Sequence, residues 1–416
     1  MSHPVKLVVT DDLQRTRASV FFRIVLAIPH FIWLTVWGIA VFFVVIANGL
    51  ITLFKGRSPD AVHQFLAEYV RYVVHVQAYV NLIADRYPGF SGHPGYPIDV
   101  QFAPSEQQNR WTVFFRLVLA IPALIVTTVL LSGATQWSSG SLLGTVAVLG
   151  WFSSLVRARM PRGMRDAGAY ALSYVAQVLA YLFVLTDRYP NSDPLAALDD
   201  LPVRDDDPIQ LEVDDDLRRS RLTTFFRLLL AVPHLIWLTL WGIAALLAAI
   251  VAWVAALITT RVPDGLHRFL AAYLRYQTRV TAYLFLIANP FPGFATGAGD
   301  YPVDLVVGPR EPHNRWSVFF RALLAIPALL LASAYGLLLA AAAVLGWFAV
   351  LVRGQMPLGL RNAGALALRY SQQTNAYLLL VTPSYPYSGP TAAPQPSSEP
   401  TPFLPPDPST AVVAGA

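Results

Sequence analysis

The chain has 416 residues, of which 55% are hydrophobic and only 13% are charged. Globular proteins carry roughly 25% charged residues, so this composition is typical of a membrane protein. The absence of cysteine excludes disulfides, thiolate metal sites and cysteine nucleophiles. The formal net charge is +5, without a basic stripe of interleaved aromatic residues, so we expect contact with anionic lipid and no nucleic-acid partner.

The N-terminal segment MSHPVKLVVTDD is short and polar, and no basic and apolar signal sequence precedes the first apolar run. We therefore expect the N-terminus to remain in the cytoplasm. A short alternating run, VKLVV, occupies 5–9, and similar runs occur at 97–102, 208–213 and 302–307. Alternation with a period of two predicts strands. We expect the four strands to form one small four-stranded β-sheet outside the membrane.

The first long apolar run begins with RASVFFRIVLAIPHFIWL at 17–34. No charged residue lies between Arg23 and Lys55, or between Arg227 and Arg261. Both stretches exceed the ~20 residues that a membrane-spanning helix needs. They predict helices in a bilayer rather than helices buried in a soluble core.

The opening motif of this run occurs four times at fixed spacing, which indicates internal repetition. Each copy has an arginine directly after Phe-Phe, another arginine six residues earlier and a proline six residues later. The arginines are Arg17, Arg23, Arg110, Arg116, Arg221, Arg227, Arg315 and Arg321, and the prolines are Pro29, Pro122, Pro233 and Pro327.

These residues predict how each repeat enters the membrane. We expect the phenylalanines to anchor at the interface, and the arginines to reach lipid phosphates or the acidic pair Asp11 and Asp12. A proline removes one backbone hydrogen bond, so each proline is expected to break or bend its helix where the helix leaves the headgroup layer.

A second proline follows each apolar run, and a tyrosine preceded by alanine lies twenty residues beyond it. These tyrosines are Tyr79, Tyr181, Tyr283 and Tyr377. We expect them to pack at the membrane interface. A shared set of ligand contacts is the alternative.

Repeats 1 and 3 match each other best, and so do repeats 2 and 4, so the chain is a duplicated pair. The predicted boundaries are 1–103 for repeat 1, 104–190 for repeat 2, 191–208 for an exposed acidic Pro/Asp linker, 209–308 for repeat 3, 309–388 for repeat 4 and 389–416 for a disordered Pro-rich tail.

Two topologies fit the apolar runs. Each run is either one tilted helix, with the next segment (60–84 in repeat 1) returning across the bilayer, or a helical hairpin with that segment along the interface. Repeat 2 carries a polar insertion, SGATQWSSGS at 132–141, which belongs in a loop because lipid cannot satisfy freed backbone groups. This insertion favours the hairpin, which also places every lysine and arginine on one side.

The helix predicted after each second proline favours the same topology. In repeat 3, Arg268, Arg275 and Arg279 fall on one face of that helix. An arginine on a spanning helix costs about 2.5 kcal/mol or more near the bilayer centre. We therefore expect an amphipathic helix at the interface. The predicted fold class is a mainly α, polytopic integral membrane protein with four repeats of apolar run plus amphipathic helix.

The motif FFRxxLAIPHxIWL, the segments LFKGRSPD and ITTRVPDG, and the closing DRYPGFSG and NPFPGFAT resemble the uncharacterised bacterial membrane proteins grouped as domain of unknown function 4389. The resemblance covers four copies from about residue 5 to residue 388. It implies a membrane protein and brings no established activity. Repeats 2 and 4 replace His63 and His267 with Arg165 and Arg361, which argues against a role that needs the histidine in every copy.

Chemistry-bearing motifs are sparse. The recurring histidines, His30 with His234 and His63 with His267, lack the carboxylates or further histidines of a metal site. We expect them to cap helices or face headgroups, and we expect no metal and no cofactor. No sequence motif of a hydrolase, an ATPase or a dinucleotide-binding protein precedes a predicted helix, so we do not expect an enzyme. Glu68 is the one acid in a predicted membrane helix, which argues against ion-coupled transport.

The sequence therefore favours a non-enzymatic membrane organiser or interaction protein that binds anionic lipid or a membrane-protein partner. The alternative is a lipid or small-solute permease with a cavity between the two pseudo-symmetric halves. A filled core between the halves favours the organiser. We expect a multi-pass protein of the plasma membrane with both termini in the cytoplasm. The oligomeric state stays open.

Overall fold

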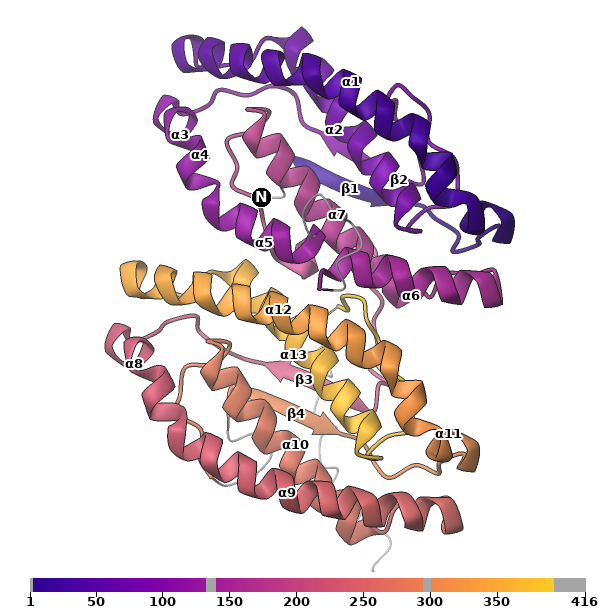
Figure 1. The fold of residues 1–416 in the computed structure, drawn as a ribbon. Helices are drawn as coiled ribbons and strands as arrows, with labels where there is room; N and C mark the ends of the chain where they lie inside the picture. Colours follow the sequence, from indigo (N-terminus) through magenta and orange to yellow (C-terminus); the bar gives the residue numbers. More distant parts are fainter. Residues whose placement is uncertain (1–2, 132–139, 295–300, 393–416) are drawn as a thin grey trace, which may run out of the picture.

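The computed structural model describes residues 3–131, 140–294 and 301–392. These residues are mainly helical, which confirms the mainly α part of the predicted class (Figure 1). The first half contains β1 (Val5–Val9), α1 (Arg17–Lys55), α2 (Asp60–Val80), β2 (Ile98–Phe102), α3 (Arg110–Phe114), α4 (Arg116–Leu119), α5 (Ile121–Leu131), α6 (Leu142–Arg157) and α7 (Arg162–Leu182).

A short 3-10 helix, η1 (Pro194–Ala196), leads into the second half. That half contains β3 (Ile209–Val213), α8 (Arg221–Phe225), α9 (Arg227–Thr259), α10 (Asp264–Leu284), β4 (Val303–Val307), α11 (Arg315–Phe319), α12 (Arg321–Arg353) and α13 (Leu358–Leu378).

The four strands form two separate antiparallel pairs, β1 with β2 and β3 with β4. This corrects the expected four-stranded sheet. Each strand pairs with the strand of the sister repeat in its own half, centred on Leu7 opposite Val100 and on Leu211 opposite Leu305. Long helices of the two halves pack together between the sheets (Figure 1), so the sheets have no common edge.

The long apolar runs of repeats 1, 3 and 4 are single helices, α1, α9 and α12, which corrects the expected hairpins. These three helices are long and apolar enough to cross a membrane, so the protein is membrane-associated. The 39 residues of α1 make it about 58 Å long at 1.5 Å per residue. This length exceeds a hydrocarbon core of ~30 Å, so α1 would extend beyond the core if it crossed the bilayer along the normal.

The prolines do not end these helices. Pro29, Pro233 and Pro327 all lie inside continuous helices, which corrects the expected break. A proline removes only its own donor, and the rest of the backbone ladder remains. The helical path is interrupted elsewhere, at Phe226 and Phe320, directly before the arginine that follows Phe-Phe. In repeat 2 the path is also interrupted at Ala120, between α4 and α5 and two residues before Pro122, so the expected break is found in that repeat.

The polar insertion of repeat 2 separates α5 from α6, as its composition predicts, although residues 132–139 lie outside the described parts of the chain. The Ser141 hydroxyl accepts the Gly144 amide at 3.1 Å and caps the start of α6. In Figure 1, α5 and α6 follow one another along one side of the half, as the single helix α9 does in the other half. The insertion therefore interrupts a long path rather than reversing it.

The helix after each second proline is central to its half. α2 packs against α7, and α10 packs against α13. Nearly every residue of α7 is buried. This corrects the expected interfacial helices. In repeat 3 the charge of Arg279 is satisfied inside the protein, because it forms an ion pair with Asp304 at 3.2 Å, whereas Arg268 remains exposed.

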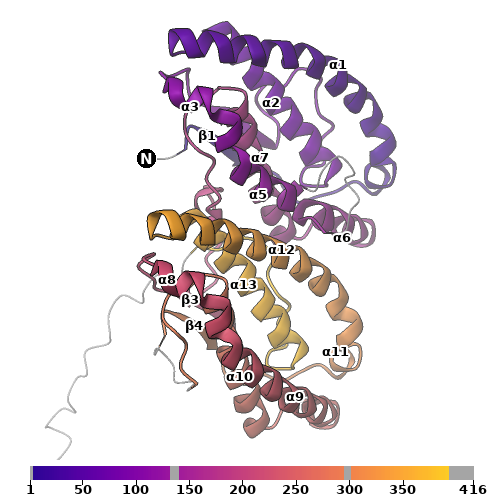
Figure 2. The same cartoon turned by 60° about the vertical axis from the view of Figure 1, so that its left-hand side comes forward.

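The two halves share a packed interface. α12 of repeat 4 lies against α5 and α6 of repeat 2, as both views show (Figure 2). In the most apolar 18-residue stretch of each helix, 44% of α12 is buried, compared with 11% of α1 and 17% of α9. One apolar core includes Leu130 and Leu143 of the first half and Leu331 and Leu338 of the second. α1 and α9 lie at opposite ends of the molecule (Figure 2).

The segment between the halves is less exposed than its acidic composition predicts. Ser192 and Asp193 are buried, and the Asn362 side chain donates to Asp193 Oδ1 at 2.9 Å. Arg204 and Asp207 form an ion pair farther along. The expected exposed linker is therefore partly a contact between halves. Of the expected tail, residues 393–416 lie outside the described chain.

Candidate functional site

The arginine that follows Phe-Phe is buried in every repeat. Arg23, Arg116, Arg227 and Arg321 are each only 2–3% exposed. Each guanidinium lies against the C-terminal turn of the next long central helix and over the tyrosine near the end of that helix. We call this arrangement the arginine clamp.

The clamp of repeat 1 joins the start of α1 to the end of α2. Arg23 Nη1 donates to the carbonyl oxygens of Tyr79 at 2.9 Å and Ala84 at 3.0 Å. Its Nη2 bonds the Asp85 carboxylate. The guanidinium lies 4.4 Å from the centre of the Tyr79 ring, within cation–π range. The last carbonyls of a helix lack backbone donors, and its C-terminus attracts positive charge, so arginine suits this position.

The other three clamps repeat these contacts. Arg116 donates to Tyr181 O and to Thr186 O, Arg227 donates to Tyr283 O and Ala288 O, and Arg321 donates to Thr382 O. The turn beyond each central helix contains a non-glycine residue with positive φ, namely Leu82, Val184, Leu286 and Leu380. The arginine holds a helix end that is closed by a left-handed residue.

The clamps correct two expectations. The four buried arginines face backbone carbonyls and tyrosine rings rather than lipid headgroups. The four tyrosines, Tyr79, Tyr181, Tyr283 and Tyr377, each contact the arginine of their own repeat and lie in four separate clamps. They do not line one shared site.

The earlier arginine of each motif is exposed: Arg17, Arg110, Arg221 and Arg315. Three of these reach the end of a long helix in the sister repeat. Arg17 donates to Val156 O at 3.0 Å, Arg221 to Val352 O at 2.9 Å and Arg315 to Ile258 O at 3.0 Å. They tie together the ends of antiparallel neighbours and leave charge at the surface.

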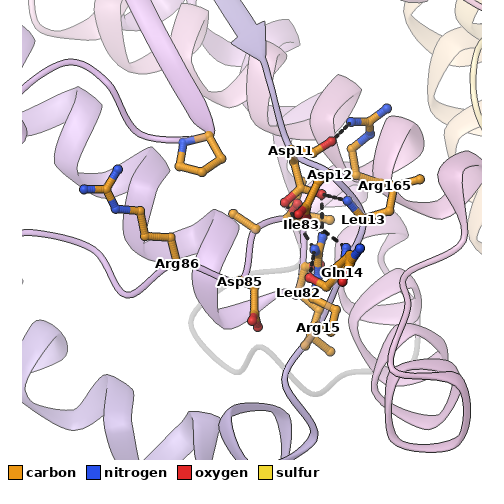
Figure 3. Close-up of polar contacts among 12 residues, drawn as sticks. Asp11, Asp12, Leu13, Gln14, Arg15, Leu82, Ile83, Asp85, Arg86 and Arg165 are labelled. Carbon is orange, nitrogen blue, oxygen red and sulfur yellow. Dashed lines mark hydrogen bonds and ion pairs between the residues drawn. The ribbon is translucent and has the colours of Figure 1, made fainter.

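A further basic group, missed from the sequence, stabilises the same turn in repeat 1. Arg15 pairs with Asp11 at 2.8 Å and donates to Leu82 O at 2.9 Å and Ile83 O at 2.8 Å (Figure 3). Asp11 was expected to form an ion pair with Arg17 or Arg23, but in the structure its partner is Arg15. The recurring Asp-Asp-Leu-x-Arg at 11–15 and 215–219 is the sequence signal that could have found this contact.

The equivalent position in repeats 2 and 4 holds an uncharged partner of the clamp. Gln108 donates to Val184 O at 2.9 Å and accepts from Arg116 at 2.7 Å. His313 Nδ1 accepts from Arg321 Nη2 at 2.8 Å. Burial, aided by the positive charge of Arg321, lowers the pKa of His313 to about 4, so the ring is neutral and can accept this bond at neutral pH.

The recurring histidines lie inside the protein, which corrects their expected placement at caps or headgroups. His30 and His234 hydrogen-bond the hydroxyls of Tyr72 and Tyr276 at 2.6 and 2.7 Å. His267 Nε2 lies 3.1 Å from Val381 O in the turn of the sister repeat. Each of these contacts joins two different elements of the fold.

A buried carboxylate lies behind each strand pair. Asp99 is 3.1 Å from His75 Nε2 and accepts the backbone amides of Gly95 and Val100, both at 2.8 Å. Burial alone raises the pKa of Asp99, but these hydrogen bonds outweigh it and leave the pKa below its ordinary value. Burial lowers the pKa of His75. Asp99 is therefore ionised, and a neutral His75 donates to it.

The four clamps lie in four segments that match one known protein family. The domain of unknown function (DUF4389) matches residues 17–91, 110–192, 221–296 and 315–388. The chain belongs to this family. The four copies confirm the predicted fourfold repetition, and each match contains one arginine clamp. No curated protein and no solved structure matches the chain.

The DUF4389 copies bring together few groups suited to catalysis. The clamp arginines are occupied by carbonyls, and the histidines donate to or accept from tyrosines, carbonyls, arginine or Asp99. Across residues 3–131, 140–294 and 301–392, no group of three histidine, aspartate or glutamate side chains could hold a metal ion. The arrangement is suited to fixing helix ends.

Repeat 1 also contains a pocket of about 290 Å³ beside the loop that follows α2, at the end of the first DUF4389 match and beyond it. His75 and Tyr96 contribute to its wall, stacked with ring centres 4.6 Å apart. Arg86, Tyr87 and His93 also line it. Neither this pocket nor its lining was predicted from the sequence.

Proposed function

We propose that this DUF4389 protein is a non-enzymatic membrane organiser that contacts anionic lipid through its exposed helices. The observation that carries the proposal is the outward apolar surface of α1 and α9. On α1, Phe21, Phe43 and Phe54 are 62%, 65% and 74% exposed. Soluble monomers rarely expose contiguous apolar patches of more than a few hundred Å², so acyl chains are the environment that suits these helices.

The buried residues of α1 form a single narrow stripe. Val20, Ala27, His30 and Val41 are among its buried residues, and the residues on either side are exposed and apolar. A helix that lay on the membrane surface would need a polar outer face. The outer face of α1 has none between Arg23 and Lys55, so the proposal places this helix within the hydrocarbon.

The packed interface between the halves supports an organiser over a permease. A permease built from two halves needs a path between them. Here α12 contacts α5 and α6 through a shared apolar core that contains Leu130, Leu331 and Leu338. The two halves therefore share one packed apolar core.

The exposed arginines supply the contact with anionic lipid. Arg17, Arg110, Arg221 and Arg315 lie at helix ends, where they can meet lipid phosphates while also donating to carbonyls. We place the protein in the plasma membrane with both termini in the cytoplasm, in line with its excess of arginine. A membrane-protein partner is included in this proposal.

Reconstitution into vesicles of phosphatidylglycerol and phosphatidylcholine tests the proposal. Lipid exchange between leaflets and leakage of a small trapped dye are compared with protein-free vesicles. The organiser produces no increase in either rate, and the purified protein retains phosphatidylglycerol in excess of its share in the vesicles. Faster exchange or leakage contradicts the proposal and favours the permease.

A further inference from the structure

The pocket of the first DUF4389 copy has a positively charged rim. Arg86 and His93 are exposed and line the pocket. Neither forms an ion pair with an acid among the described residues, and the Arg86 side chain makes only a long hydrogen bond, 3.5 Å from Nη1 to Gly95 O. Figure 3 shows Arg86 directed away from the Asp11 and Arg15 pair. These two side chains are free to meet an anion.

The acids nearest to this rim are already neutralised. Asp85 is bonded by Arg23 and accepts the Thr16 amide at 3.0 Å. Asp99 is held by His75 and lies 3.3 Å from Arg71. An anion that enters the pocket therefore meets the positive charge of Arg86 and the donors of His93, without an unpaired carboxylate opposite them.

The pocket lies next to the lipid-facing surface of α1. The Trp33 indole donates to Phe90 O at 2.9 Å and ties the pocket loop to α1. Trp33, Tyr87 and Phe90 are all exposed, beside the exposed Ile28 and Ile32 of the same helix. Exposed tryptophan and tyrosine next to apolar surface are typical of the membrane interface, at the depth of lipid headgroups.

Repeat 3 keeps the aromatic residues but loses the charge. Trp237, Phe291 and Phe294 are exposed at the equivalent positions, and Pro290 stands where repeat 1 has Arg86. The aromatic collar therefore belongs to both repeats, whereas the arginine is absent from repeat 3 and from repeat 4, which has Ser384 at this position, and repeat 2 keeps an arginine there, Arg188. Because the same left-handed turn forms in repeats 3 and 4 without an arginine, the fold does not require Arg86.

We infer that this pocket binds the phosphate of an anionic phospholipid headgroup through Arg86 and His93, while the acyl chains of that lipid lie along α1. The inference rests on the proposed function and names its lipid site. The planar guanidinium of Arg86 suits two phosphate oxygens at once, and an imidazole N–H of His93 suits a third.

Isothermal titration of the full-length protein in detergent tests the inference with three probes. Short-chain phosphatidylglycerol carries both phosphate and acyl chains, the matching diacylglycerol lacks the phosphate, and inorganic phosphate lacks the chains. The variants are Arg86→Gln and His93→Gln. Arg57→Gln is the control, because Arg57 is also exposed, at the far end of α1, and its loss removes the same charge.

Phosphatidylglycerol should bind the wild type more tightly than either other probe. Its affinity should fall about tenfold in Arg86→Gln, because a charge-assisted contact is lost, and by less in His93→Gln. Arg57→Gln should stay within about twofold of wild type. Inorganic phosphate that binds as tightly as the lipid would overturn the lipid assignment in favour of a free anion.

The remaining outcomes separate this inference from the proposed function. If phosphatidylglycerol binds the wild type and Arg86→Gln equally well, the pocket is not the site, although contact with anionic lipid stands. If the wild type binds phosphatidylglycerol no better than diacylglycerol, both the site and the lipid contact fall.

Discussion

Arginine in the clamp combines three contacts that lysine cannot make together. In repeat 3, Arg227 Nη1 reaches the carbonyls of Tyr283 and Ala288, and its planar group lies 4.4 Å from the Tyr283 ring centre. A lysine ammonium is a compact point charge without a stacking plane. The clamp therefore depends on the shape of the guanidinium as well as on its charge.

The change Arg227→Lys should lower the free energy of unfolding by about 1–3 kcal/mol, because at least one buried carbonyl loses its donor. The control is Arg221→Lys, six residues earlier and exposed, where the loss should stay within about 0.5 kcal/mol. Thermal unfolding in detergent measures both. An equal loss at the two positions would show that burial of Arg227 does not matter.

The clamp of repeat 4 should make stability depend on pH through His313. The unfolded histidine titrates near pH 6.5, and the pKa of His313 in the folded protein is about 4. Between these values the unfolded chain binds more protons, so stability falls as the pH falls through this window. The loss should approach roughly 3 kcal/mol at pH 4.

The variant His313→Gln installs the residue that repeat 2 has at Gln108, and it should remove most of this acid sensitivity while keeping an acceptor for Arg321. Unfolding midpoints at pH 7, 5.5 and 4.5 test the prediction. A pH profile unchanged by the substitution would mean that other groups cause the acid loss.

The sequence revealed the spacing of the clamp residues but not their contacts. Arg23 and Tyr79 stood out because they recur at fixed offsets. The groups that hold Arg23, such as Tyr79 O, are backbone carbonyls 56 or more residues away, and backbone carbonyls leave no residue-type signal. From the sequence alone, an arginine at a predicted membrane boundary is most simply interpreted as a headgroup anchor. In the structure, Arg23 is instead buried against the C-terminal end of α2.

At the scale of elements, the long helices continue through their prolines. Pro29 is exposed and lies well inside α1, so its ring is on the outer face of the helix, and the missing donor removes one backbone hydrogen bond. The expected break at Pro29 is absent, although α1 as a whole is curved (Figure 2). The sequence identified Pro29 as an unusual position in the apolar run, but the predicted break of the helix at this residue is wrong.

The change Pro29→Ala should therefore raise the free energy of unfolding by about 1 kcal/mol or more, because it restores a backbone donor in a continuous helix. Pro59→Ala is the control. Pro59 lies at the N-cap of α2, where no intrahelical bond is gained. Thermal unfolding compares the two, and a destabilised Pro29→Ala protein would show that the helix needs the proline.

The central helices show why an amphipathic pattern can mislead. A polar stripe that includes Arg275 and Arg279 is compatible with headgroups and equally with internal ion pairs. The partner, Asp304, lies on β4, and no local rule connects it to α10. The strands themselves were found from their alternation, but their pairing within each half depends on how the halves pack, which alternation does not encode.

At the scale of the whole molecule, repeats 2 and 4 meet each other, whereas repeats 1 and 3 face outward. The same type of long apolar helix is thus largely buried against protein in α12 and mostly exposed in α1 and α9, where we propose that it contacts lipid. The same substitution on the two surfaces should therefore lower the free energy of unfolding by different amounts.

Leu338→Ala removes a fully buried side chain from α12 and should lower the free energy of unfolding by about 2–5 kcal/mol, through lost transfer energy and a residual cavity. Leu247 on α9 is 61% exposed, so Leu247→Ala should cost less than about 1 kcal/mol. Thermal unfolding in detergent measures both costs. Equal costs would contradict the assignment of the two surfaces.

The central claim is that the outer surface of α1 lies in lipid. Because the chain has no cysteine, a spin label can be placed at one chosen residue, and Phe43→Cys puts it on the exposed side of α1, with Val41→Cys as a buried control. Collision rates with oxygen and with a water-soluble nickel complex are then compared in vesicles. The account predicts frequent collisions with oxygen and few with nickel at residue 43, and few with either at residue 41. Frequent nickel collisions at residue 43 would place α1 in water and contradict the account.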